Sequence, residues 1–189
     1  MIKKLYWILK TNRIKKKLAS CGDNTTIDKG AQIAFANCIF IANNVYIGPD
    51  SWISAQGGLL IEEGVIIGPR VRIHTMNHNY KHPEALPYDG VSILKKVSIK
   101  KNVWIGADVT LLPGVEVGEG SIIAAGSVVT KSIPPLCIVG GNPSKKIGQR
   151  EPNLYYKLCL EGNIYLKLKK EKKISFKAIR ESRNISNEY

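Results

Sequence analysis

The sequence has no long apolar run and no closely spaced pair of cysteines. The longest apolar stretch near the start, residues 5–9, stops at Lys10, well short of the roughly 20 residues that a membrane-spanning helix needs. No small-residue cleavage site of the kind that ends a secretion signal follows it. The four cysteines include no C-x-x-C pair, which disfavours a disulfide or zinc framework. We therefore expect reduced thiols and a cytoplasmic protein.

Aromatic residues are also few, at 7% of the 189 residues, while 44% are hydrophobic and 23% are charged. This balance excludes intrinsic disorder and a collagen-like chain as descriptions of the whole protein. A chain of this length buries enough surface to build a core without metals or disulfides. The composition predicts one globular domain with additional segments at its ends.

Acidic residues are absent from the first 20 residues, which hold seven Lys and Arg, so this segment carries +7. Residues 145–189 hold twelve basic and five acidic residues and also carry +7, whereas residues 21–144 carry −1. The net charge of +13 therefore lies in the two ends of the chain. This distribution argues against a nucleic-acid-binding face on the body and leaves two interpretations of the ends: solvated tails, or segments that contact something anionic.

What the sequence does have is a six-residue period of aliphatic residues. Six is a multiple of two, so it returns side chains to one face of an extended strand, and it fits neither helix nor simple alternation. Clusters of Asn, Asp, Gly and Pro supply corners between short strands. The pattern predicts a β-solenoid with three sides per coil. The longest unbroken series is Ile99, Ile105, Leu111, Val117, Ile123 and Val129.

The period breaks in three places, which define the expected organisation. Residues 1–20 form a basic amphipathic segment with a helix over residues 2–18, and residues 21–148 form the solenoid. A loop at residues 74–96 interrupts the solenoid, and loops of this length are usually functional or disordered. Residues 149–189 form a basic tail that is helical over 153–180, after Pro152. The helix over 2–18 either docks on the solenoid end, which we favour, or contacts an anionic membrane.

Three motifs give the sequence its resemblance to a known family: IGADVTLLPGV at 105–115, AAGSVVTKSIPP at 124–135 and GNPSK at 141–145. With them the chain resembles the hexapeptide-repeat acyltransferases. It is most similar to the galactoside and maltose O-acetyltransferases and to the sugar O-acetyltransferases of capsule and O-antigen synthesis. The resemblance implies an all-β fold, a left-handed parallel β-helix, assembled as a homotrimer with active sites between subunits.

Acetyl transfer to an alcohol needs a general base, and histidine is the side chain that titrates near neutral pH. The three histidines, His74, His78 and His82, all lie in or beside the loop at 74–96. The family motif places the base at His78. His82 and Asn77 are expected to bind the acceptor, and His74 is expected to be structural. A metal site built from the three histidines, as in the gamma-type carbonic anhydrases, is a weaker alternative, and we expect no metal.

The resemblance also implies a site for acetyl-CoA, the acyl donor. Trp104 and Ala107 would flank the pantetheine arm, and Ala125 would offer backbone contacts. Gln56, which precedes Gly57-Gly58 on the coil below the loop, is a candidate for binding a sugar hydroxyl. The nucleotide end of the coenzyme would contact Thr130, Lys131 and Lys145.

The sequence thus predicts an acetyltransferase that moves an acetyl group from acetyl-CoA to a hydroxyl of a sugar or surface-polysaccharide precursor. The short lysine-rich N-terminal segment favours a lipid-linked or nucleotide-linked sugar over a free sugar. Two alternatives stay open: N-acetylation of an amino sugar, and a non-catalytic β-solenoid that serves as an assembly module. Expected partners are a glycan acceptor and the other subunits, with peripheral membrane contact through the basic tails as a further option and no nucleic acid.

Overall fold

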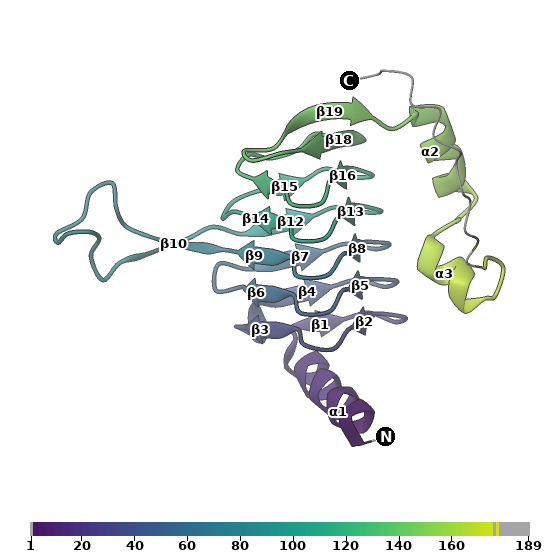
Figure 1. The fold of residues 1–189 in the computed structure, drawn as a ribbon, viewed down its shortest axis with the longest axis horizontal. Coiled ribbons are helices and arrows are strands. Elements are labelled where there is room, and N and C mark those ends of the chain that lie inside the picture. The colour runs from purple at the N-terminus through teal and green to yellow at the C-terminus, as the bar shows by residue number, and fades with distance from the viewer. Residues whose placement is uncertain (1, 176, 178–189) are drawn as a thin grey trace, which may run out of the picture.

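The protein is built around a stack of short strands, and the computed structural model describes residues 2–175 and 177. Five complete coils of three strands each can be followed in this part of the chain (Figure 1). They are β1 (Ser20–Cys21), β2 (Thr26–Ile27) and β3 (Gln32–Ala34); β4 (Ile39–Ile41), β5 (Tyr46–Ile47) and β6 (Trp52–Ser54); β7 (Leu59–Ile61), β8 (Ile66–Ile67) and β9 (Arg72–His74); β12 (Val97–Ile99), β13 (Trp104–Ile105) and β14 (Thr110–Leu111); β15 (Glu116–Val117), β16 (Ile122–Ile123) and β17 (Val128–Val129).

Strands of successive coils pair in parallel and form three sheets. The first sheet has the order β1-β4-β7-β12-β15 and the third β17-β14-β9-β6-β3. The second runs from β2 through β5, β8, β13 and β16 to β18 (Cys137–Gly140) and β19 (Lys145–Gln149). This is the predicted left-handed parallel β-helix. A short 3-10 helix, η1 (Ala36–Cys38), connects the first and second coils.

The six-residue series forms the core. Ile99, Ile105, Leu111 and Val117 have no exposed surface, and Ile123 and Val129 are at most 1% exposed. Each of these residues stacks on its equivalent in the next coil, as Ile105 does on Ile67 and Ile123. Burial of a side chain of this size contributes about 1.5–3 kcal/mol, so the repeated aliphatic position accounts for most of the cohesion between coils.

The corners between strands use left-handed backbone, as the Asn, Asp and Gly clusters predicted. Asn44 and Asn102, at corresponding corners, have φ of 57° and 56°. Asn tolerates this conformation because its short amide can form local hydrogen bonds, and here the Asn44 amide donates to Glu63 at 2.8 Å. At these corners an unfavourable left-handed backbone conformation is offset by side-chain hydrogen bonds that connect neighbouring coils.

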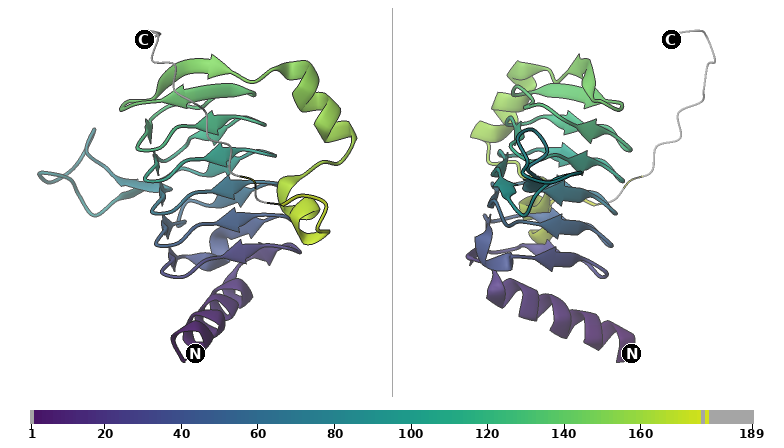
Figure 2. Two further views of the ribbon diagram at one scale, coloured as in Figure 1. Left: turned by 45° about the vertical axis from the view of Figure 1, so that its right-hand side comes forward. Right: turned by 90° about the vertical axis from the view of Figure 1, so that its left-hand side faces the viewer.

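Helix α1 (Ile2–Lys17) covers the N-terminal end of the coil stack (Figure 2). Leu18, which follows it, is buried in the core cluster, and Ile14 packs against that cluster. The Lys15 ammonium donates to the carbonyl of Thr25 in the first coil. The C-terminal half of the helix therefore docks on the solenoid, as expected.

At the other end of the stack, β18 and β19 form an antiparallel hairpin, and two helices follow it. These are α2 (Pro152–Leu160) and α3 (Tyr165–Lys170), so the predicted helical segment is interrupted at Gly162, which has φ of 66°. A left-handed glycine is a common helix terminator. The second helix ends at Lys170, so the prediction of helix is wrong for residues 171–175, and residues 176 and 178–189 lie outside the described part of the chain.

Helices α2 and α3 descend along the edge between the first and second sheets (Figure 1). The buried Tyr155 joins α2 to this edge: its hydroxyl donates to Glu119 at 3.0 Å and accepts from the Asn102 amide at 3.2 Å. Burial raises the pKa of Tyr155, so the phenol stays protonated and able to donate. In the described part of the chain, no helix is both long and apolar enough to cross a bilayer.

Candidate active site

The loop at residues 74–96 leaves the solenoid between β9 and β12 and projects sideways from it (Figure 1). Its base is an antiparallel hairpin of β10 (Met76–His78) and β11 (Ser92–Leu94), in which Asn77 is opposite Ile93. Where the loop begins and ends, the Lys95 N–H donates to the Thr75 carbonyl at 2.8 Å. The insertion is therefore closed at its base.

A glycine turn of the coil below supports that base. The Gly57 N–H donates to the Thr75 hydroxyl at 2.8 Å, and the buried Thr75 hydroxyl donates to the Ser54 carbonyl at 3.0 Å. A Cβ on Gly57 would collide with the Thr75 carbonyl oxygen and the Lys95 nitrogen. Only glycine lets the two chains approach this closely, so the Gly57-Gly58 pair seats the loop.

Asp89 organises the outer part of the loop. One carboxylate oxygen accepts from the Asn79 amide at 2.8 Å and from the Glu84 N–H at 3.2 Å, and the other accepts from the Val91 N–H at 2.9 Å. The hydrogen bond from Val91 is the largest cause of the lowered pKa of Asp89. The carboxylate is thus charged at neutral pH and ties together three points of a loop that lacks a hydrophobic core.

His78 lies at the end of β10, with an exposed side chain. Its ring stacks on that of Tyr88, with centroids 3.8 Å apart and planes inclined by 14°. Its backbone N–H donates to the Asn77 side-chain oxygen at 2.9 Å. The Tyr88 ring covers one face of the imidazole and restricts its rotation, while the exposed side chain keeps the ring accessible.

A cavity of about 360 Å³ separates the loop from the fourth and fifth coils. Its size suits a small organic molecule rather than a water. The solenoid supplies three of its lining residues, Leu112, Pro113 and Thr130, from the edge between the third and first sheets. The loop supplies Asn77, His78, Asn79, Tyr80, Lys81, His82, Ile93 and Lys95. The structure thus brings together four of the residues singled out from the sequence: Asn77, His78, His82 and Thr130.

His74 has different surroundings. It is half-buried at the end of β9, with its ring centroid 5.0 Å from that of Trp52. Burial, together with the nearby Arg72 guanidinium, lowers the pKa of His74 below its ordinary value of 6.5. His74 is not among the cavity-lining residues. Its position agrees with the structural role expected for it.

Trp104 lies on the second sheet, on a different side of the molecule from the loop (Figure 1). Its side chain is 51% exposed, between Ile66 and Ile122 of the adjacent strands. It lines a separate groove with Tyr155 and Tyr165. In a single chain, Trp104 and His78 therefore belong to different surfaces.

The remaining sequence-predicted contacts occupy corners and the end of the stack. Ala107 and Ala125 are at equivalent corners between the second and third sheets, where the Gly126 N–H donates to the Ala107 carbonyl at 2.8 Å. Lys131 is exposed one residue beyond Thr130, and Lys145 is exposed at the start of β19, opposite Gly140. Gln56 is half-buried on the second coil and does not line the cavity.

Comparison with known proteins identifies the family to which the solenoid belongs. The family model "Bacterial transferase hexapeptide (six repeats)" matches residues 96–131. The galactoside O-acetyltransferase of Escherichia coli strain K12 is 32% identical over 147 residues, which cover 76% of this chain and 71% of the relative. The chain belongs to the hexapeptide-repeat acetyltransferases.

Several solved structures of related proteins contain coenzyme A. A galactoside acetyltransferase in complex with coenzyme A is 27% identical, with a TM-score of 0.60 over 76% of this chain and 70% of that one. A variant of AntD, an N-acyltransferase from Bacillus cereus, in complex with dTDP and coenzyme A is 26% identical. Its TM-score is 0.64, over 82% of this chain and 95% of that one.

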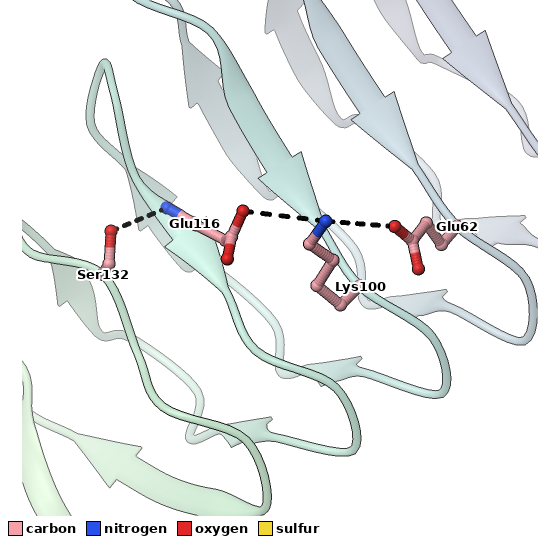
Figure 3. Close-up of polar contacts among 4 residues, drawn as sticks. All are labelled: Glu62, Lys100, Glu116 and Ser132. Carbon is pink, nitrogen blue, oxygen red and sulfur yellow. Dashed lines mark hydrogen bonds and ion pairs between the residues drawn. The ribbon is translucent and has the colours of Figure 1, made fainter.

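A second polar cluster on this hexapeptide-repeat protein connects neighbouring coils (Figure 3). The Lys100 ammonium lies 3.2 Å from Glu62 and 3.7 Å from Glu116, and the Glu116 N–H donates to the Ser132 hydroxyl at 3.0 Å. Glu62, and then Glu116, raise the pKa of Lys100. The cluster pairs opposite charges across three coils, which gives it a structural role. Over residues 2–175 and 177, no group of three or more His, Cys, Asp or Glu side chains is placed to hold a metal ion.

Sequence reasoning missed the residues that shape the site around His78. Tyr88, Asp89, Ile93 and Lys95 lie 10 to 17 positions after His78, in a segment without periodicity. Asp89-Gly90 is a turn dipeptide, but β10 and β11 pair with His78 opposite Ser92, so residues 79–91 connect the two strands and the dipeptide is not the hairpin turn. A tight turn at that dipeptide would have predicted a different register, and the contact between Tyr88 and His78 had no local signal in the sequence.

Proposed function

We propose that this protein transfers an acetyl group from acetyl-CoA to a hydroxyl of a sugar or surface-polysaccharide precursor. The observation that carries the proposal is the accessible His78 imidazole, stacked on Tyr88 in a cavity between the loop and the coils. Membership of a family that includes galactoside O-acetyltransferases supports it. So does the coenzyme A bound in the related galactoside acetyltransferase structure.

In the proposed reaction His78 acts as general base. A neutral ring nitrogen accepts the acceptor's hydroxyl proton while the hydroxyl oxygen attacks the thioester carbonyl carbon. The carbon–sulfur bond then breaks, the acetyl ester remains on the sugar, and the imidazolium returns the proton to the departing coenzyme A sulfur. The stack with Tyr88 holds the ring for both transfers. Asn77 and His82 line the same cavity and are proposed to bind the acceptor.

The proposed coenzyme site uses Trp104, Ala107, Ala125, Thr130, Lys131 and Lys145. Lys131 and Lys145 are exposed cations near one end of the stack and suit the phosphates of the nucleotide. Charge-assisted hydrogen bonds contribute about 1.5–3 kcal/mol, so Lys145→Ala is expected to weaken coenzyme A binding about ten-fold or more, measured by titration calorimetry. Lys146→Ala is the matched control, because that ammonium is bonded to Gln149. Equal affinities for the two variants would move the phosphate site elsewhere.

We propose a homotrimer because Trp104 and His78 lie on different sides of one chain. A coenzyme that contacts both would lie between two subunits, with Trp104 from one and His78 from its neighbour. Co-assembly of Trp104→Ala chains with His78→Ala chains tests this. Mixed trimers are expected to recover activity at low acetyl-CoA that neither variant has alone. No recovery in mixed trimers, or a fully active monomer by light scattering, would contradict a shared site.

The activity itself is tested by following coenzyme A release with a thiol reagent across sugars, nucleotide sugars and lipid-linked glycans. Release that depends on a hydroxyl acceptor is the expected result. The same panel contains amino sugars, because the resemblance to an N-acyltransferase favours N-acetyl transfer as the second candidate. A stable trimer without coenzyme A release or binding would favour the assembly module instead.

A cytoplasmic location forms part of the proposal, since Cys21, Cys38, Cys137 and Cys159 are free thiols.

A further inference from the structure

Two basic segments that are far apart in the sequence both lie in the lower part of the molecule, one beneath the first coil and one along the flank of the first three coils. Helix α1 covers the N-terminal end of the solenoid, and α3 lies beside the lowest coils (Figures 1 and 2). The Asn24 amide of the first coil donates to the Leu166 carbonyl of α3 at 3.1 Å. The fold therefore brings the lysines of α3 into the same part of the molecule as the basic helix α1, although the two segments belong to opposite ends of the chain.

Helix α1 presents two different faces. Trp7, Thr11 and Ile14, spaced by four and three residues, are half-buried toward the solenoid. On the outer face, Tyr6 and Leu9 are 57% and 56% exposed, and the next two positions of the same helical stripe are the exposed Arg13 and Lys16. The helix contains no acidic residue. Its outer face thus joins an apolar patch to a basic one.

Helix α3 and the residues after it repeat this combination. Lys167, Lys169 and Lys170 are exposed, and so are Lys172 and Lys173 just beyond the helix. The same segment carries the exposed Tyr165, whose ring lies 5.9 Å from the Lys169 ammonium. Of the acids nearby, Glu171 is paired with Lys173 at 2.7 Å. Most of the positive charge of α3 therefore faces solvent, on the flank of the lower coils above α1.

We propose that this part of the protein, the outer face of α1 with the lysines of α3, docks on the anionic surface of a lipid bilayer. Basic side chains near such a surface are attracted by its negative potential, and each strengthens binding about five-fold. Tyr and Leu enter the zone between headgroups and acyl chains, while Arg and Lys remain at the headgroups. A nucleic acid would attract the cations but would gain nothing from the exposed Leu9, which is why the observations favour the membrane.

Docking in this orientation has a consequence for the acceptor, which rests on the proposed function. The loop with His78 leaves after the third coil, and parallel strands are spaced by about 4.8 Å. With the roughly 10 Å diameter of α1 added, the cavity lies on the order of 25 Å above the bilayer surface, within reach of an extended glycan attached to a lipid in the same bilayer. The acceptor class that fits this geometry is a membrane-bound lipid-linked glycan.

Flotation of the full chain with vesicles tests the docking without any use of catalysis. Vesicles of phosphatidylcholine alone are compared with vesicles that also contain phosphatidylglycerol. The wild type is expected to float only with the anionic vesicles, and less at high salt. R13Q/K16Q removes two cations and should weaken binding about thirty-fold, and Y6S/L9S should abolish the binding that persists at high salt. The matched control K101Q/K157Q removes two exposed lysines from other parts of the surface and should float like the wild type.

Three outcomes would overturn the proposal. They are no flotation with anionic vesicles, an equal loss in R13Q/K16Q and in the control, and displacement of the protein from vesicles by an excess of RNA. Helical content by circular dichroism verifies that each variant is folded. Coenzyme A release with a water-soluble acceptor should be the same in R13Q/K16Q and wild type. Failure of that activity in both, with flotation intact, would reject the proposed function and leave the docking surface standing.

Discussion

The coils and the inserted loop of this protein are stabilised in opposite ways. In the coils, the aliphatic side chains stack in a dry column and polar groups occupy the corners. In the loop, residues 77 to 96 include no buried side chain, and the order comes from Asp89 hydrogen bonds and the stack of Tyr88 on His78. The coils thus provide stability while the loop carries the proposed chemistry. A substitution should therefore affect one property or the other, according to its place.

The largest difference between an effect on catalysis and an effect on stability is expected at His78. Loss of a positioned general base costs about 10²–10⁴ in rate, so His78→Ala should lower kcat by that factor. Because its side chain is exposed, the melting temperature and coenzyme A affinity should stay unchanged. Steady-state kinetics and thermal unfolding of the same preparation measure both.

His82→Ala serves as the control within the same cavity, and its main effect should be a higher KM for the acceptor. Addition of a chelator should leave the rate unchanged. If His78→Ala retains more than half of the wild-type activity, another group takes the proton, and His82 becomes the residue to test.

In the core the opposite is expected, namely that a substitution lowers stability strongly. Leu111 is fully buried in β14, and truncation of such a side chain costs about 2–5 kcal/mol of unfolding free energy. Leu111→Ala should therefore lower stability strongly in urea unfolding. Ile93→Ala removes an aliphatic side chain that is 38% exposed in the loop, and should cost about 0.5 kcal/mol. Similar losses for the two variants would show that the loop folds cooperatively with the coils.

A smaller effect is expected at Tyr88, which acts through His78. An aromatic pair in contact is worth about 0.5–1.5 kcal/mol, so Tyr88→Ala should reduce kcat about two- to ten-fold, and Tyr88→Phe should restore it because the stacking ring is kept. The measurement is kcat as a function of pH at saturating acceptor. A reduction in Tyr88→Phe as large as in Tyr88→Ala would assign the role to the hydroxyl instead of the ring.

The smallest effect concerns His74, the histidine that belongs to the coils. Its pKa is lowered in the fold, first by burial and then by Arg72, so the folded state favours the neutral ring. The unfolded chain therefore takes up the proton first as the pH falls below about 6.5, and the stability that neutral His74 contributes is lost. The difference in melting temperature between wild type and His74→Asn should shift against the wild type from about pH 8 to about pH 5. A pH-independent difference would contradict this.

The coils could be predicted from the sequence, whereas the inserted loop could not. The series from Ile99 to Val129 predicted the coils and the core because each position meets the same environment in every coil. The corner residues Asn44 and Gly114 were also recognisable, since their backbone needs are local. A repeated physical constraint leaves a repeated signal, and that signal was sufficient for the fold.

The loop leaves no such signal. His78 was identified through the family motif. Its partner Tyr88 comes ten residues later, in a hairpin whose residues show no periodic pattern. The groove that joins Trp104 to α2 and α3 depends on how the tail folds back along the coils, a tertiary arrangement that residues 149–170 do not specify locally. The prediction of one helical segment over 153–180 missed both the break at Gly162 and the direction of the chain after it.

The hydrogen bond between Lys95 and Thr75 returns the chain to the position that it left, so the third and fourth coils pair as if nothing separated them. The entropy cost of a closed loop grows only slowly with its length. The pairing of the coils therefore depends little on the length or sequence of the insertion. Hairpins of other lengths and sequences could be grafted between Thr75 and Lys95 while the coils keep their register. Such exchange offers a direct route by which one solenoid could acquire new acceptors, in the course of evolution or in the laboratory.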